Sequence, residues 1–252
     1  MRKIIVALFL VVLMASPAFA LFTNGGFENG TFSGWSMDYG IRPYGNTQVI
    51  NWGQANNNLS AIMDASSPNQ SGQTLDINPY NNNYFARLND INGSYHATKI
   101  WQEDTISQAD IDAGSTLYVN WGTALIEPSN AHPDGAQPFF GIYVTVGANP
   151  PSYFEANALD HDTTWTNAGY NGGTLWYKSG TFSYDLTGYA IGTNVKVELF
   201  VADCGWGGHG GFAFLDGIGT TYQQPQVPEP TTMLLLGLGL VGVASMRRKI
   251  QK

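Results

Sequence analysis

Carboxylates are the most numerous side chains that could do chemistry. The chain contains 19 Asp and Glu residues, four His and one Cys. A glycosidase needs two carboxylates about 5–10 Å apart, and among so many acids some pair always meets that spacing. The sequence shows no G-x-S-x-G, H-E-x-x-H or P-loop motif. It therefore names no catalytic residue and predicts a protein that is not an enzyme.

The histidines and the single cysteine show no motif spacing that indicates a metal or a nucleophile. His161 lies between Asp160 and Asp162, but adjacent residues rarely converge on one ion. Cys204 has no second cysteine with which to form a disulfide. No histidine lies at a motif spacing that would activate it, so we expect a small buried residue there.

Tryptophans are the candidate ligand-binding residues. Flat aromatic rings pack against the C–H faces of sugars, while amides and carboxylates bind the hydroxyls. Trp52, Trp165 and Trp206 lie in loop-like surroundings rich in Gly and Asn, where an exposed indole indicates a ligand surface. Three others are expected in the core, one near the start of the domain and two within predicted strands: Trp35, Trp101 and Trp121.

Short alternating apolar segments dominate the middle of the chain. Turn residues separate them, and β-branched and aromatic side chains are frequent, which is typical of an antiparallel β-sandwich. The predicted strands span 84–88, 99–102, 117–121, 139–146, 176–182, 195–201 and 212–215. Helix is scarce: its best candidate is 107–113, which could equally be a turn, and 51–83 is expected to form long loops with one strand.

The two ends of the chain differ from the middle. Residues 1–20 have a basic start, an uninterrupted apolar run and an A-x-A site at Ala18-Phe19-Ala20, which is the order of a secretory signal peptide. The alternative for residues 1–20 is an N-terminal membrane anchor or a buried helix. Residues 223–230 form a proline-rich linker, and 231–252 combine an uncharged stretch with a basic end, which predicts a transmembrane sorting segment rather than a terminal core helix.

What lies between the ends is one domain, 21–222, by length. Residues 21–230 contain five Lys and Arg against 19 Asp and Glu, a net charge of −14. Such an acidic domain will not bind nucleic acid or anionic lipid through charge, whereas it suits divalent cations and neutral ligands.

The C-terminal segment resembles the PEP-CTERM family of sorting signals. The resemblance rests on a Pro-Glu-Pro motif, an apolar stretch and a basic cluster, which here comprise Val227, Pro228, Glu229, Pro230, Arg247, Arg248 and Lys249. It implies export from a Gram-negative host that makes extracellular polysaccharide. It also implies transient anchoring in the inner membrane and processing by an exosortase.

The middle resembles jelly-roll domains of the galactose-binding-like and carbohydrate-binding-module superfamily. The start motif covers 24–30 with Gly34-Trp35, and the closing motif covers the glycine-rich stretch 202–216. The resemblance implies a structural calcium ion at Glu28 and Asp216, at opposite ends of the domain sequence. Without that ion, Glu28 would accept hydrogen bonds from nearby backbone and Asp216 would cap a turn.

Together these features predict an exported, non-catalytic protein that binds or organises extracellular polysaccharide, as in a biofilm. A structural surface protein with no sugar binding is the alternative, and a secreted glycoside hydrolase is the third possibility.

Overall fold

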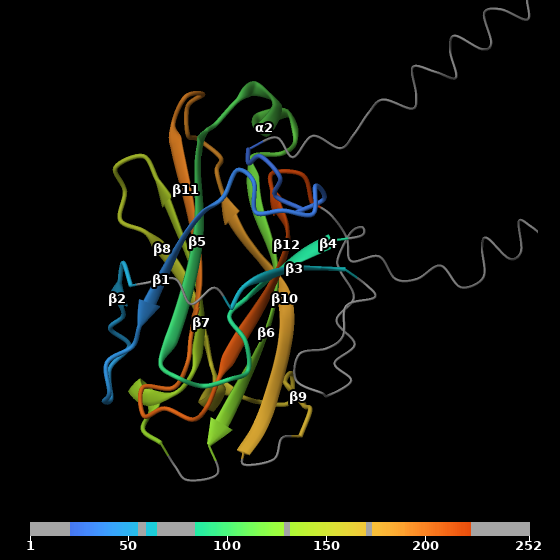
Figure 1. Ribbon diagram of the computed structural model, residues 1–252. Helices are drawn as coiled ribbons and strands as arrows, with labels where there is room; N and C mark the ends of the chain where they lie inside the picture. The colour runs from blue at the N-terminus through green and yellow to red at the C-terminus, as the bar shows by residue number, and fades with distance from the viewer. Residues whose placement is uncertain (1–20, 55–58, 65–83, 129–131, 170–172, 223–252) are drawn as a thin grey trace, which may run out of the picture.

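The computed structural model describes residues 21–54, 59–64, 84–128, 132–169 and 173–222. These residues fold into two antiparallel sheets that face each other (Figure 1), which confirms the all-β sandwich. The predicted signal peptide, proline-rich linker and sorting segment lie outside the described residues. Within the described ranges, no helix is long and apolar enough to cross a membrane.

Each sheet contains six strands in this part of the chain. The first sheet has the order β2-β1-β5-β11-β7-β8. Its strands are β1 (Ser36–Ile41), β2 (Asn51–Trp52), β5 (His96–Thr105), β7 (Phe139–Val146), β8 (Ser152–Asn157) and β11 (Asn194–Ala202).

The second sheet has the order β3-β4-β12-β6-β10-β9. Its strands are β3 (Ala61–Asp64), β4 (Tyr84–Leu88), β6 (Thr116–Pro128), β9 (Thr166–Asn167), β10 (Gly173–Asp185) and β12 (Gly211–Gly219). All seven predicted strands are therefore confirmed, two of them, β4 and β7, with the predicted bounds.

The core lies between the sheets because strand side chains alternate between the two faces. In β11 the inward side chains are fully buried: Val195, Val197, Leu199 and Val201. The opposite positions of this strand, Lys196, Glu198 and Phe200, point to the outer face of the first sheet. This alternation leaves one outer surface available for other side-chain chemistry.

Helical structure is limited to short segments among the described residues. The helix α2 (Gln108–Asp112) falls within the predicted helix, and Ser107 caps it through a reciprocal pair of hydrogen bonds with Asp110, which stabilises the helix start. Two single 3₁₀ turns, η2 (Asp134–Ala136) and η3 (Ala158–Asp160), lie in the loops before β7 and after β8.

The N-terminal loop packs against the last strand. The backbone N–H of Ile218 donates to the Gly25 carbonyl at 2.9 Å. Phe27 and Trp35 are buried and stack with their ring centroids 5.5 Å apart. The two ends of the domain are thus adjacent, as the jelly-roll resemblance implies, and Trp35 occupies the core as predicted.

Candidate functional site

A cavity opens on the outer face of the first sheet. Its volume is about 240 Å³, and its lining mixes aromatic rings with polar and charged groups from the β1–β2 loop, β2, β5, β7, β8 and β11. We call it the aromatic cavity. It is lined by Gln48, Ile50, Trp52, Lys99, Phe139, Tyr143, Glu155, Glu198 and Phe200.

Two strand glycines make room for aromatic rings against the sheet. A Cβ atom on Gly141 would come within 2.2 Å of Phe200 Cζ; one on Gly40 would come within 2.4 Å of Ile50 Cγ2 and 2.9 Å of Trp52 Cε3. Gly141 pairs directly with Phe200, and Gly40 with Trp52. The missing side chains therefore create the space that these two rings occupy.

Neighbouring rings hold Phe200 in place. Tyr143 stacks beside it with centroids 5.2 Å apart and an interplanar angle of 15°, and Phe139 meets it edge-on at 5.7 Å. Phe139 and Phe200 are buried at the cavity floor, whereas Tyr143 is 36% exposed. The floor is therefore apolar and rigid, and part of its aromatic surface is open to solvent.

Polar groups surround these rings. The Gln48 side-chain amide donates to Glu155 Oε1 at 2.5 Å. Burial raises the pKa of Glu155, which the hydrogen bond from Gln48 partly offsets. The Lys99 ammonium lies 4.5 Å from the centroid of Trp52 and 3.7 Å from Asp38 Oδ2. The cavity can therefore offer both donors and acceptors beside flat rings.

The three predicted sugar-binding tryptophans lie in different surroundings in the structure. Trp52 lines the aromatic cavity. Trp206 is 37% exposed and stacks on Tyr44, outside the cavity lining. Trp165 is only 7% exposed and belongs to the main core, so the expectation of an exposed indole is wrong there. Its loop turns inward at Asp162, whose carbonyl accepts from the Trp165 N–H.

The core prediction was right for Trp121 and wrong for Trp101. Trp121 is buried among the core side chains, next to Phe140. Trp101 lies on the outer face of the first sheet, where the ammonium groups of Lys99 and Lys196 are 5.3 and 6.0 Å from its ring centroid. An alternating strand presents both faces, and the sequence did not reveal which face the sandwich would cover.

The predicted calcium ligands lie on segments that the fold brings together. Glu28 belongs to the N-terminal loop that bonds to Ile218, two residues beyond Asp216. Asp216 is buried and accepts from the Gly217 N–H at 2.7 Å, at a register shift in the pairing of β12 with β6. A carboxylate on the N-terminal loop and one on the adjoining strand β12 supply oxygen donors of the kind that calcium prefers, and the calcium site stays a prediction.

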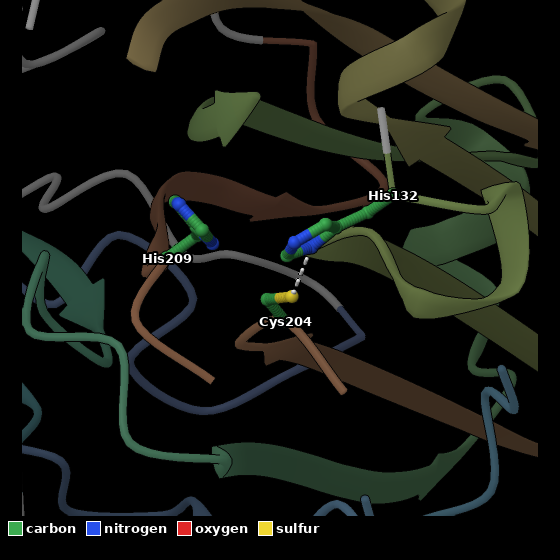
Figure 2. A group of neighbouring side chains, drawn as sticks. All are labelled: His132, Cys204 and His209. Atoms are coloured by element: carbon green, nitrogen blue, oxygen red, sulfur yellow. Dashed lines mark hydrogen bonds between the residues drawn. The ribbon is translucent and has the colours of Figure 1, made fainter. Parts of the chain in front are cut away.

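The sequence did not reveal a second cluster of functional side chains, which includes His132 and Cys204. Figure 2 shows the His132 ring directed toward Cys204. The His132 Nδ1 lies 3.1 Å from Cys204 Sγ. Cys204 is fully buried, as predicted, and the histidine beside it is one that no motif spacing indicated. His132 lies 72 residues away in sequence, so the loops that follow β6 and β11 had to be placed before the pair could be found.

His161 lies neither in the lining of the aromatic cavity nor in the cluster with His132 and Cys204. Its ring stacks on Trp176 with centroids 4.0 Å apart, and its Nδ1 lies 3.6 Å from Glu127 Oε2. The structure thus gives His161 a packing role on the second sheet.

Asp203 is a fully buried carboxylate beside this second cluster. Its two oxygens accept from the backbone N–H groups of Ser94, His96 and Gly211, at 3.0–3.2 Å, and from the Asn89 amide at 2.8 Å. Burial raises its pKa to about 8, although the hydrogen bonds favour the ionised form. Asp203 thus links the end of β11 to the loop between β4 and β5 through hydrogen bonds.

Residues 226–249 match the family described as the PEP-CTERM protein-sorting motif. The matched range contains all the residues that carried the sequence resemblance, Val227 to Pro230 and Arg247 to Lys249. The motif indicates an exported protein that is sorted to the cell envelope or the extracellular space, and it implies processing by an exosortase.

Several solved structures are similar to this chain, each at low sequence identity and with a TM-score below 0.5. TmCBM61, solved in complex with β-1,4-galactotriose, is 13% identical to this chain. The match covers 78% of this chain and 94% of TmCBM61, with a TM-score of 0.42. A cyclase from Fischerella sp. TAU is 13% identical over 78% and 92% of the two chains, with a TM-score of 0.41.

A carbohydrate-binding module specific for non-crystalline cellulose, CBM28, is 15% identical over 77% and 91% of the two chains, with a TM-score of 0.37. These similarities assign no ligand or activity to this chain. No curated protein matches the sequence.

Proposed function

We propose that this exported protein is a non-catalytic carbohydrate-binding protein that binds or organises extracellular polysaccharide. The aromatic cavity is its sugar site. The observation that carries the proposal is the pair of rings, Trp52 and Phe200, that pack over strand glycines beside polar side chains.

The rings and the polar groups fit the two faces of a pyranose. The C–H face of a sugar packs on an aromatic plane, and the hydroxyls need hydrogen-bond partners at its edge. Trp52 and Tyr143 offer the planes, and Gln48, Glu155 and Glu198 offer amide and carboxylate groups. The volume is slightly below the range of about 300–1,000 Å³ usual for ligand pockets, which suits one sugar unit of a longer chain.

The charge of the domain supports a neutral glycan. Residues 21–230 carry a net charge of −14, which repels acidic polymers at a distance. Lys99 is engaged by Asp38, and Lys196 by Glu198 at 3.1 Å, so these cations at the outer face are already partnered. A neutral polysaccharide is therefore the expected ligand class.

Glycoside hydrolysis remains the second candidate, because Glu155 and Glu198 line the same cavity. Burial raises the pKa of Glu155, as a general acid requires. Turnover that depends on either carboxylate would place the protein in that class.

The test is binding of the purified protein to a panel of neutral and acidic glycans, followed by titration of the best ligand. Trp52→Ala should weaken binding at least tenfold, which corresponds to about 1.4 kcal/mol. Trp206→Ala is the matched control, because it removes a partly exposed indole that does not line the cavity. It should leave the affinity unchanged.

Three results would count against the proposal. If the folded wild-type protein binds no glycan, the structural surface-protein alternative gains. If Trp206→Ala abolishes binding and Trp52→Ala does not, the sugar site lies elsewhere. Hydrolysis of the bound glycan, lost in Glu155→Gln, would favour the hydrolase.

A further inference from the structure

Three side chains with metal-binding atoms meet at one end of the sandwich. His132 lies in the loop between β6 and β7, while Cys204 and His209 lie in the loop between β11 and β12. One ligand atom from each lies within 4.8 Å of the other two. Figure 2 shows the three side chains gathered from these two loops.

The spacing is close to what a tetrahedral metal site needs. With metal–sulfur and metal–nitrogen bonds of about 2.3 and 2.0–2.1 Å, ligand atoms lie roughly 3.4–3.6 Å apart. The distance from His132 Nδ1 to Cys204 Sγ, 3.1 Å, is slightly shorter than this range. All three ligand atoms lie within 4.8 Å of one another, an upper limit that is longer than the range. Binding thus requires only small side-chain rotations.

The cluster is largely buried, and its ligand atoms have few competing bonds. Cys204 is fully buried and His132 is 7% exposed. The Nδ1 atom of His209 is buried without a hydrogen bond of regular geometry in the described part of the chain, although the Gly207 backbone lies close to this ring. The Trp206 N–H donates to Cys204 Sγ at 3.2 Å, as backbone amides do to ligating sulfur.

A buried arginine holds the two loops together. The Arg42 guanidinium donates from Nη1 to the carbonyls of Gln137 and Asp203, at 2.5 and 2.7 Å. Those carbonyls belong to the segments that carry His132 and Cys204. The Gln137 amide donates to the His132 carbonyl at 2.9 Å, and Gly205 N–H to the Ala136 carbonyl at 2.8 Å.

The loop that carries two of the ligands is equally fixed. Cys204 N–H donates to the His209 carbonyl at 2.9 Å and Gly207 N–H to the Cys204 carbonyl at 3.1 Å. Gly207 and Gly208 both have φ near +80°, which a side chain would disfavour. The turn thereby places Cys204 and His209 next to each other, so the fold positions the cluster before any ion binds.

We propose that His132, Cys204 and His209 bind a thiophilic transition-metal ion of the zinc or copper type. One thiolate and two imidazoles are the ligands that these ions prefer, and calcium or magnesium would need oxygen donors. Three protein ligands leave a fourth position for water or another molecule. The site also gives a use to the single cysteine of an exported protein, which has no intramolecular disulfide partner.

The experiment is titration of the purified, reduced protein with Co(II), which serves as a coloured substitute for zinc. One equivalent should produce a thiolate-to-metal charge-transfer absorption. Because the chain has one cysteine, that band can arise only from Cys204. Zn(II) and Cu(I) are then added separately as competitors, and the ion that displaces cobalt at the lower free concentration identifies the preferred metal.

Variants separate the site from adventitious binding. Cys204→Ser should abolish the band, and His132→Ala and His209→Ala should each weaken cobalt binding at least tenfold. His161→Ala is the matched control, because that ring stacks on Trp176 away from the cluster, and it should change nothing. Urea unfolding of each variant establishes that it is folded.

The proposal fails if folded wild-type protein gives no charge-transfer band with Co(II). It also fails if the band persists at wild-type affinity when both His132 and His209 are alanine. His209→Ala keeps the test valid if His132→Ala does not fold, because His209 is only partly buried.

Discussion

A methyl group added at Gly141 tests whether the floor of the aromatic cavity is built as described. The new Cβ would lie 2.2 Å from Phe200 Cζ and 2.5 Å from Cε1, whereas carbon atoms in contact are normally about 3.5–4.0 Å apart. The ring cannot move away freely, because Tyr143 stacks on it and Phe139 meets it edge-on.

The expected cost follows from two opposing effects. Overpacking a buried site costs about 1–3 kcal/mol, while replacing a strand glycine with alanine normally gains about 0.5–1 kcal/mol. Gly141→Ala should therefore lower the free energy of unfolding by up to about 2.5 kcal/mol and weaken glycan binding. Urea unfolding with an unchanged m-value measures the first effect.

A double-mutant cycle isolates the contact. In a Phe200→Ala background the steric conflict is gone, so Gly141→Ala should be neutral or slightly stabilising, with a coupling energy of about 1–3 kcal/mol between the two sites. Gly180→Ala in β10 is the control, because its Cβ would lie 3.3 Å from the nearest atom, Trp121 Cζ2. Additive costs for Gly141 and Phe200 would refute this reasoning.

Two further predictions concern carboxylates. Since burial raises the pKa of Asp203 to about 8, above its unfolded value, the folded state holds the proton more tightly. The stability that Asp203 contributes should then be fully present below about pH 4 and be lost as pH rises to about 8; urea midpoints across this range should show this loss as a difference in slope between wild type and Asp203→Asn. A wild-type profile that is flat there would show that the N–H donors keep Asp203 ionised. Calcium at a hundredfold excess over its dissociation constant should stabilise the protein by about 2.7 kcal/mol; thermal melting in EDTA and in calcium should show the gain in wild type and its loss in Glu28→Ala and Asp216→Ala. Equal melting temperatures in the two buffers would remove the calcium site.

The alternation of side chains predicted the strands because it reflects burial on one face, a local property. In β7 and β11 every second residue is apolar and buried, and the predicted bounds agree closely. The same alternation does not say which face of β5 is covered, so it wrongly predicts that Trp101 lies in the core. The prediction for Trp165 is wrong because a loop-like composition does not reveal that a turn at Asp162 directs the indole inward.

The sequence by itself determined the class of fold, the sorting motif at residues 226–249 and the presence of an aromatic surface residue at Trp52. These depend on composition, periodicity and contiguous motifs. Only the tertiary structure assembled Trp52 with Phe200 and Tyr143, or Cys204 with His132 across 72 residues. Their proximity depends on strand order, and strand order follows from how both sheets bury their apolar faces together rather than from any local signal.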